Sequence, residues 1–350
     1  MTYLDWAASA VPSISVSDYS YEWFNPNSKY AVNEVKKFSE CEEKVKNAIG
    51  AKSGKVVFGG NASWFFEKLY VNQADFCDFW LCSPYEHDCI YRNGLQADYN
   101  KLKSISNEIY CHQFVQNITG EIFPVDKIGK SIREKNGFFV CDATSGIGKA
   151  KIPDNIDDWC DVFVGSSHKL AVDNKQIGFA WISDKFAKWL LLEGSVVNGY
   201  GLVDGTPDLA CARATTTSVV KSCKNVGYYD ESYAYLNVHL IYALESNNIR
   251  FRVVPVSKEN GSCCAIISVI LNDINSDVLC NYLASKEIYV SPGHSACEEN
   301  SDYRVLKQYG LNDEECNSTI RVSFGPETTI DDINKLVDGI VRFKEEYCND

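Results

Sequence analysis

Short apolar segments that alternate with helical segments constrain the fold of this chain more than any other feature. Apolar residues recur at helical spacing through 35–49 and 64–70, on either side of the first strand-like segment. Strands separated by helices predict a mainly parallel sheet with both faces covered. The expected strands are 55–58, 79–83, 109–115, 137–141, 161–164 and 177–182.

Polar residues follow several of these strands at the point where each strand ends. Ligands of an open α/β sheet gather at the carboxyl ends of its strands, so these side chains are candidates for one shared site. Their convergence is more informative than any single member. The candidates are Ser63, His87, Asn117, Asp142 and Lys169.

The pair Asp142 and Lys169 narrows the chemistry of that site. Lys169 follows an apolar strand among small hydroxyl residues, and Asp142 ends the strand before it. Pyridoxal phosphate needs a lysine to carry it as a Schiff base and an acidic residue to keep its ring nitrogen protonated. The pattern alone also fits an ordinary loop lysine and a turn-capping aspartate.

The turn at 59–63 has the form of a phosphate site. It lies between a strand and a helix, where free backbone amides and the positive end of the helix dipole meet, and Ser63 adds a hydroxyl. Most such glycine turns bind nothing, so this signal is weak when taken alone.

The pattern changes near residue 228, where a smaller α+β region begins. Helices are expected at 230–246, 277–285 and after the capping residues Thr328 and Thr329, and strands at 251–256, 263–271 and 319–324. We therefore expect a large domain at 16–227, and a small domain formed by 1–15 and 228–350.

Composition excludes several classes of partner. With a net charge of −13 and a pI near 4.9, the chain is expected to bind neither nucleic acid nor an anionic membrane. It contains no apolar run long enough to span a bilayer and no leader-like N-terminus, which predicts a soluble cytoplasmic protein. Its 15 cysteines are scattered, which favours buried thiols in a reducing compartment over disulfides or zinc.

Nine short segments carry a resemblance to a known family. They are YLD at 3–5, NPNS at 25–28, EH at 86–87, Asn117, DAT at 142–144, SSHK at 166–169, GTP at 205–207, SPGHSAC at 291–297 and RVSFG at 321–325. In this order the chain resembles the cysteine desulfurases of the NifS and IscS kind, within the class V, fold-type I pyridoxal phosphate enzymes. The resemblance implies a large domain with a mainly parallel sheet of the seven-stranded type, and a smaller α+β domain.

The resemblance also implies a role for each matched residue. Lys169 would hold pyridoxal 5'-phosphate and move protons, His87 would stack on its ring, Asp142 would pair with the ring nitrogen, and Asn117 would lie near the ring substituents. Arg321 would clamp the substrate carboxylate. The expected phosphate ligands are Ala62, Ser63, Ser166, His168 and, from the other subunit of a homodimer, Thr206.

Cys297 is the expected nucleophile. The small, polar residues around it suit an exposed loop, where a thiolate can attack sulfur. By resemblance it would take the sulfur of L-cysteine as a persulfide, leave alanine, and pass the sulfur to an acceptor or scaffold protein. The chain departs from the family at Ser145, where glutamine is usual, and the stretch after Cys297 is short.

Two other hypotheses stay open at this level. The same scaffold carries class V aminotransferases and selenocysteine lyases, in which Cys297 would be incidental. The second hypothesis is a protein of this fold that no longer catalyses and serves as a binding partner. The presence of Lys169, Asp142 and His87 together argues against this hypothesis.

Overall fold

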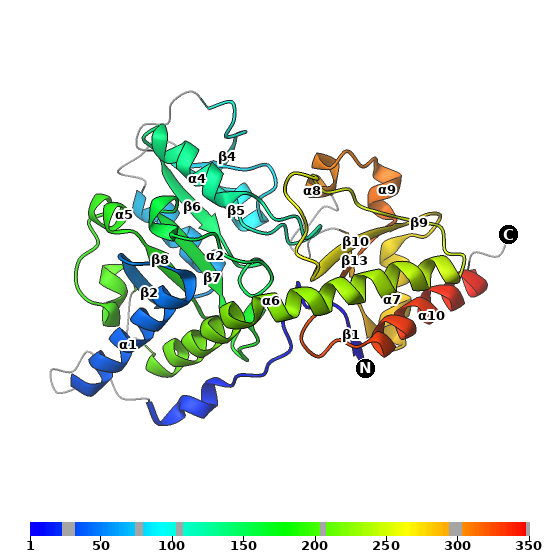
Figure 1. Ribbon diagram of the computed structural model, residues 1–350, viewed down its shortest axis with the longest axis horizontal. Coiled ribbons are helices and arrows are strands. Elements are labelled where there is room, and N and C mark those ends of the chain that lie inside the picture. The colour runs from blue at the N-terminus through cyan, green and yellow to red at the C-terminus, as the bar shows by residue number, and fades with distance from the viewer. Residues whose placement is uncertain (23–31, 74–79, 103–107, 204–207, 294–302, 348–350) are drawn as a thin grey trace. The chain divides into compact units, whose positions relative to one another are not determined.

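The computed structural model describes residues 1–22, 32–73, 80–102, 108–203, 208–293 and 303–347 (Figure 1). The chain forms two compact units. Unit 1 comprises Met1–Ala10, Val115–Ile122 and Gly227–Asp350, and unit 2 comprises Val11–Phe114 and Phe123–Val226. The domain boundaries expected from the sequence stay a prediction; they differ from these units chiefly at Val115–Ile122, which clusters with unit 1.

The core of unit 2 is a sheet of seven described strands in the order β2-β8-β7-β6-β5-β3-β4. Strands β4, β3, β5, β6 and β7 are parallel, and β8 runs antiparallel to both of its neighbours, β7 and β2. The sheet is therefore mainly parallel, as predicted. The strands are β2 Lys55–Gly59, β3 Trp80–Cys82, β4 Leu95–Gln96, β5 Ile109–Gln113, β6 Phe138–Asp142, β7 Val162–Ser166 and β8 Gly178–Ile182.

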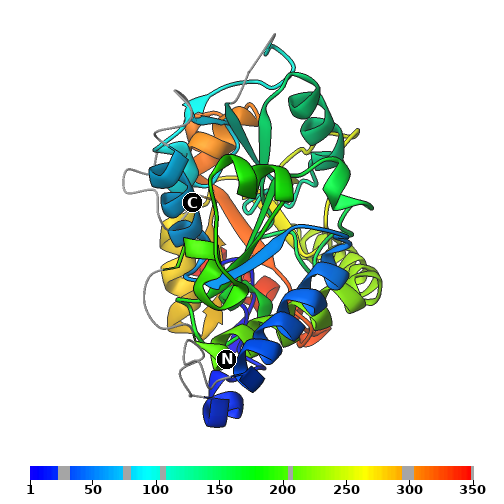
Figure 2. The same cartoon turned by 90° about the vertical axis from the view of Figure 1, so that its left-hand side faces the viewer.

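The central strands of this sheet are buried on both faces. Every residue of β5, β6, β7 and β8 is buried, which explains their continuous apolar sequences. Figure 2 shows helices crossing in front of the strands. The helices of unit 2 are η1 Val16–Glu22, α1 Val32–Ile49, α2 Ala62–Gln73, α3 Asp88–Tyr91, α4 Val125–Glu134, η2 Ile156–Asp158, η3 Ser167–Leu170, α5 Asp184–Trp189 and η4 Val196–Gly201.

Unit 1 contains a second, smaller sheet in the order β12-β13-β10-β9, and a parallel pair formed by β1 and β11. Its strands are β1 Thr2–Tyr3, β9 Phe251–Val253, β10 Ile266–Leu271, β11 Ile288–Tyr289, β12 Ser291–Pro292 and β13 Thr319–Ser323. Its helices are α7 Ser276–Ser285, α8 Arg304–Gln308, α9 Asp313–Asn317 and α10 Ile330–Tyr347.

Helix α6, Leu209–Ser246, belongs to both units and begins well before the predicted start at Asp230. The β-branched run at 215–217 disfavours a helix when read locally. Its hydroxyl groups are bonded instead: Thr216 donates to the Ala212 carbonyl at 2.8 Å, and Thr215 lies 2.9 Å from the Ser167 hydroxyl. The Thr216 bond lies within the helix, whereas the contact of Thr215 with Ser167 is a tertiary contact that offsets the local preference.

Within the described residues, no helix combines the length and the apolar character needed to cross a membrane.

Candidate functional site

Asp142 and Lys169 lie at the ends of adjacent parallel strands. Asp142 is the last residue of β6 and pairs with Val164 of β7, and Lys169 is on η3, which follows β7 directly. The Asp142 carboxylate is buried and accepts the Thr144 amide at 2.9 Å. Strand register therefore brings the expected lysine and aspartate to one edge of the sheet.

The Lys169 amine has a hydroxyl partner from the turn after β6. Its Nζ donates to Ser145 Oγ at 3.3 Å. Ser145 is the position where the related family usually has glutamine, and it is buried. The departure from the family pattern thus leaves a short side chain whose hydroxyl meets the lysine.

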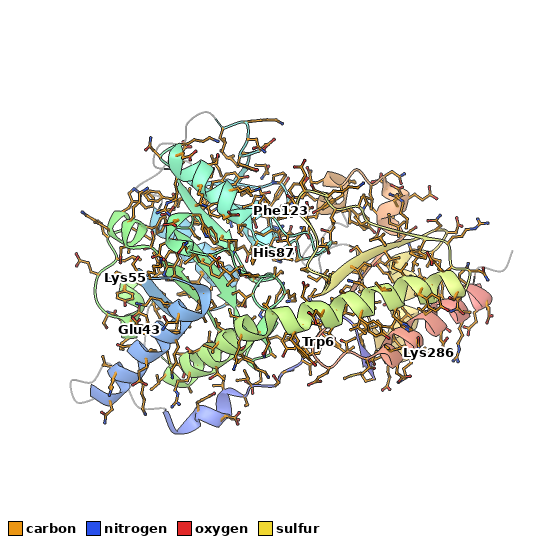
Figure 3. All side chains as sticks on the ribbon, viewed as in Figure 1. Trp6, Glu43, Lys55, His87, Phe123 and Lys286 are labelled. Atoms are coloured by element: carbon orange, nitrogen blue, oxygen red, sulfur yellow. The ribbon has the colours of Figure 1, made fainter. Side chains whose placement is uncertain are left out.

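His87 is fixed by the helix that it caps. It is the N-cap of α3, and its Nδ1 accepts the Cys89 amide at 3.3 Å and lies 3.2 Å from Cys89 Sγ. The charge of Asp142 raises the pKa of the Cys89 thiol, and the charge of Lys169 lowers it. The contact of His87 with Cys89 therefore places His87 in the same region as these two residues. Figure 3 labels His87 in unit 2.

Ser166 and His168 form a hydrogen-bonded pair on the same edge. Ser166 Oγ lies 2.8 Å from His168 Nδ1. The pKa of His168 is lowered to about 4, chiefly by burial and secondly by nearby positive charges, with Lys169 first among them. At neutral pH this imidazole is therefore an uncharged hydrogen-bonding group.

The turn before α2 exposes the start of that helix. Asn61 caps it, since its Oδ1 accepts the Trp64 amide at 3.1 Å. The amides of Ala62 and Ser63 lie in the first turn, where a helix supplies no acceptor of its own. Gly178 allows close backbone approach beside this turn, because an added Cβ would lie 2.5 Å from the Gly165 carbonyl and 3.0 Å from the Gly60 carbonyl.

Arg321 lies in unit 1, on β13, and is buried among acceptors. Its Nη2 donates to Asp5 Oδ1 at 2.8 Å and Ser291 Oγ at 3.0 Å, and its Nη1 donates to the Asn117 carbonyl at 3.0 Å. Its Nε is buried and has no hydrogen-bond partner among the described residues. The Nε–H of the guanidinium can therefore donate to a further acceptor.

Asn117 is therefore grouped with Arg321, in unit 1. Its backbone carbonyl makes this contact, whereas the sequence led us to expect a side-chain role beside Asp142 and Lys169. Two further predicted residues, Thr206 and Cys297, lie outside the described residues.

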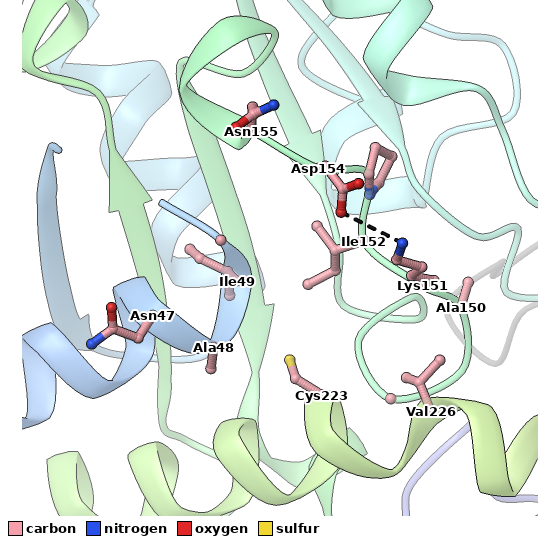
Figure 4. Close-up of a pocket in the computed structure, with 13 residues that line it drawn as sticks. Asn47, Ala48, Ile49, Ala150, Lys151, Ile152, Asp154, Asn155, Cys223 and Val226 are labelled. Carbon is pink, nitrogen blue, oxygen red and sulfur yellow. Dashed lines mark ion pairs between the residues drawn. The ribbon is translucent and has the colours of Figure 1, made fainter. Parts of the chain in front are cut away.

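A pocket of about 570 Å³ in unit 2 contains none of the predicted site residues (Figure 4). It lies between the end of α1, the loop 148–155 and Cys223 of α6. The ion pair between Lys151 and Asp154, at 3.5 Å, crosses part of it, and both side chains are 80% exposed. An exposed pair of this kind contributes little to stability.

Residues 96–336 match the model of the aminotransferase class-V family, so the chain belongs to that family. This confirms the predicted class. Curated relatives with similar sequences are named cysteine desulfurases. A probable mitochondrial cysteine desulfurase of Dictyostelium discoideum is 24% identical, over 91% of this chain and 76% of the relative. Cysteine desulfurase IscS of Clostridium botulinum is 23% identical, over 96% of this chain and 92% of the relative.

Solved structures confirm the predicted fold. A NifS-like protein superposes with a TM-score of 0.82 at 19% identity, covering 99% of both chains. A NifS-like protein from Rickettsia africae gives a TM-score of 0.80 at 19% identity, covering 100% of both chains. The chain therefore has the fold-type I architecture of NifS-like proteins.

Sequence reasoning missed several partners of the predicted site residues. The sequence assigns no role to Cys89 beyond that of one of the scattered cysteines, and none to Ser291. The position of Cys89, two residues after a potential N-cap, is a local signal for its contact with His87. Nothing in the local sequence indicates that Ser291 meets Arg321.

Proposed function

We propose that this protein is a pyridoxal phosphate-dependent cysteine desulfurase, which converts L-cysteine to L-alanine and takes up the sulfur on Cys297. The observation that carries the proposal is the edge of the large sheet. There Asp142 and Lys169 follow adjacent parallel strands, and the charges of both shift the pKa of Cys89, which contacts His87. The chain belongs to the aminotransferase class-V family.

The side chains at this edge fit the cofactor. Thr144 Oγ1 is buried and has no hydrogen-bond partner among the described residues, so the site keeps a hydroxyl for a ligand. The buried Asp142 suits a protonated ring nitrogen, and the His87 ring offers a flat face. Phosphate would be held by the amides of Ala62 and Ser63, by Ser166 and His168, and by Thr206 from a second subunit. When bound, the cofactor supplies an electron sink for the carbon that loses a proton.

Lys169 would carry the cofactor and also move the proton. Its Nζ would take the proton from the substrate Cα and deliver it during formation of alanine. The hydroxyl of Ser145, 3.3 Å away, holds the amine at the sheet edge when it is not engaged. A half-buried amine that is held in place meets the geometric requirement of a general base.

Arg321 would bind the substrate carboxylate. Its buried Nε is a donor without a partner among the described residues, and an oxygen of the substrate carboxylate would accept from it, while Nη2 stays bonded to Asp5 and Ser291. Asp5 and Ser291 hold the guanidinium in one orientation, so little side-chain freedom is lost when the substrate binds.

Cys297 would complete the reaction. Its thiolate attacks the substrate sulfur, a sulfur–sulfur bond forms, and the bond between Cβ and sulfur breaks with its electron pair left on carbon. Protonation of that carbon gives alanine, so L-cysteine and one thiol become L-alanine and one persulfide. The persulfide sulfur would then pass to an acceptor or scaffold protein.

A homodimer and a cytoplasmic location belong to the same proposal. Thr206 would reach the phosphate of the other subunit, which requires two copies of the chain. The location stays a prediction, because the curated relatives include both mitochondrial and bacterial proteins.

The decisive experiment compares sulfide and alanine release from L-cysteine under reducing conditions. The unaltered protein should release both in equal amounts, and Cys297→Ala almost none. Cys264→Ala, which changes a half-buried cysteine of the same unit, should match the unaltered protein. Equal release by all three, or by none, would overturn the proposal.

Two further readouts separate the other hypotheses. Consumption of a 2-oxo acid as amino acceptor, unaffected by Cys297→Ala, would identify an aminotransferase. Purified protein without a yellow chromophore would favour a noncatalytic protein. With the proposed function, the chromophore is present and Lys169→Ala removes it.

A further inference from the structure

The geometry around Cys89 fixes the proton on the His87 ring. The Cys89 amide points at His87 Nδ1 from 3.3 Å, and a backbone N–H can only donate. His87 Nδ1 is therefore the acceptor and carries no proton, so the neutral ring holds its proton on Nε2. The contact results from the fold of α3, in which His87 is the N-cap with an extended backbone (φ −63°, ψ 149°).

The Cys89 thiol strengthens the same arrangement. Its Sγ lies 3.2 Å from His87 Nδ1, well within the range of a hydrogen bond that involves sulfur. Since Nδ1 carries no proton, the thiol is the donor. Cys89 thus donates to His87 Nδ1 twice, once from its backbone amide and once from its thiol.

The thiol is suited to donate and unsuited to act as a nucleophile. The pKa of Cys89 is raised to about 12, chiefly by burial and secondly by the charge of Asp142. The thiol therefore keeps its proton at neutral pH. A role as a second sulfur acceptor, which needs a thiolate, is excluded by this environment.

Ser63 completes a chain of hydrogen bonds on the other side of the thiol. Its side chain hydrogen-bonds Cys89, and Ser63 lies in the first turn of α2, at the proposed phosphate site. The hydroxyl donates to sulfur, and the thiol donates to His87 Nδ1. The chain runs from the proposed phosphate site to the proposed ring-stacking imidazole within unit 2.

We propose that Cys89 is a positioning residue for His87, holding the ring in the Nε2-protonated form and linking its orientation to Ser63. For its catalytic consequence the inference rests on the proposed function. The protonation state of the His87 ring can be tested whether or not the proposed function is correct. None of the motifs that relate the chain to the desulfurases assigns a role to this position.

Nitrogen NMR of protein labelled with ¹⁵N-histidine tests the inference directly. The chain has five histidines, and His87→Gln identifies the His87 signals by their loss. We expect an unprotonated Nδ1 and a protonated Nε2 in the unaltered protein. In Cys89→Ala the backbone amide still donates to Nδ1, so the ring should stay protonated on Nε2, but the signals should shift, that of Nδ1 most, because Nδ1 loses the thiol as its second donor. Cys89→Ser, which keeps a donor at this position, should restore them.

Activity of the cofactor-loaded enzyme is the second readout. Loss of one hydrogen bond predicts that kcat falls roughly fivefold in Cys89→Ala and recovers in Cys89→Ser. Cys223→Ala, another half-buried cysteine of unit 2, should leave both readouts unchanged. His87 signals in Cys89→Ala that equal those of the unaltered protein would overturn the inference.

The outcomes separate this inference from the proposed function. If the ring signals depend on Cys89 but L-cysteine yields no sulfide, the positioning role stands and the desulfurase proposal fails. If Cys89→Ala does not fold, Ser63→Ala tests the chain from its other end with the thiol intact. Unchanged His87 signals in Ser63→Ala would show that Ser63 does not affect His87, and would overturn the proposed connection between the two residues.

Discussion

Arg321 shows how a single buried side chain can be tested for substrate binding. Its guanidinium makes three bonds in a fixed fork, to Asp5, Ser291 and Asn117. Arg321→Lys keeps the positive charge but loses the fork, so KM for L-cysteine should rise more than tenfold while kcat changes less. Steady-state sulfide release over a range of L-cysteine concentrations measures both constants.

Arg252→Lys is the matched control for that change. Arg252 also lies in unit 1 and pairs with Glu315, but its side chain is 47% exposed. We expect no effect on KM or kcat. A normal KM in Arg321→Lys would show that another group binds the carboxylate.

At the scale of one element, β13 is held to the N-terminal segment by a close contact. Gly325 is the second residue after the end of this strand, and an added Cβ would lie 2.0 Å from the Trp6 ring, which is 6% exposed. Figure 3 labels Trp6. Gly325→Ala forces the ring to move, so it should lower the free energy of unfolding by about 1–3 kcal/mol in a urea titration.

For Gly227→Ala we expect the opposite effect, a rise in the free energy of unfolding. Gly227 lies inside α6, where an added Cβ meets nothing within 4 Å. Alanine favours the helix, so this variant should raise the free energy of unfolding by roughly 1 kcal/mol. A loss of stability in Gly227→Ala would contradict the open surroundings described for it.

For the whole molecule, buried histidines predict how stability depends on pH. His112 is 4% exposed, packs on Phe123 at a ring distance of 4.5 Å, and its pKa is lowered to about 4 by burial. The unfolded chain, with a histidine pKa near 6.5, takes up this proton first as the pH falls. The free energy of unfolding should therefore fall between pH 6.5 and 4, by about 3 kcal/mol for His112.

Urea titrations at several pH values, compared with His112→Asn, measure this contribution. Asparagine can keep the donor that faces the Gln113 carbonyl, 2.8 Å from His112 Nδ1, but it does not titrate. The two proteins should differ progressively less as the pH falls from 6.5 to 4. Parallel curves for His112→Asn would contradict the prediction.

Much of the fold and part of the site could be predicted from the sequence, because they follow from local patterns. Fully buried parallel strands need continuous apolar runs, and polar residues that follow them must lie at the carboxyl edge. Asp142 and Lys169 were located in this way, and register between β6 and β7 brings them together. The contact of His87 with Cys89 is also local, since it spans two residues.

Only the tertiary structure decided the contacts between distant segments. Asp5 and Arg321 are 316 residues apart, and they meet because Asp5 forms a parallel bridge with Ser323 beside β13. Helix α6 begins at Leu209, and inside it the Thr215 hydroxyl is bonded to that of Ser167, 48 residues earlier in the chain. Local sequence carries the preferences of each segment, but the partner of a buried polar group is chosen by packing, which depends on the whole chain.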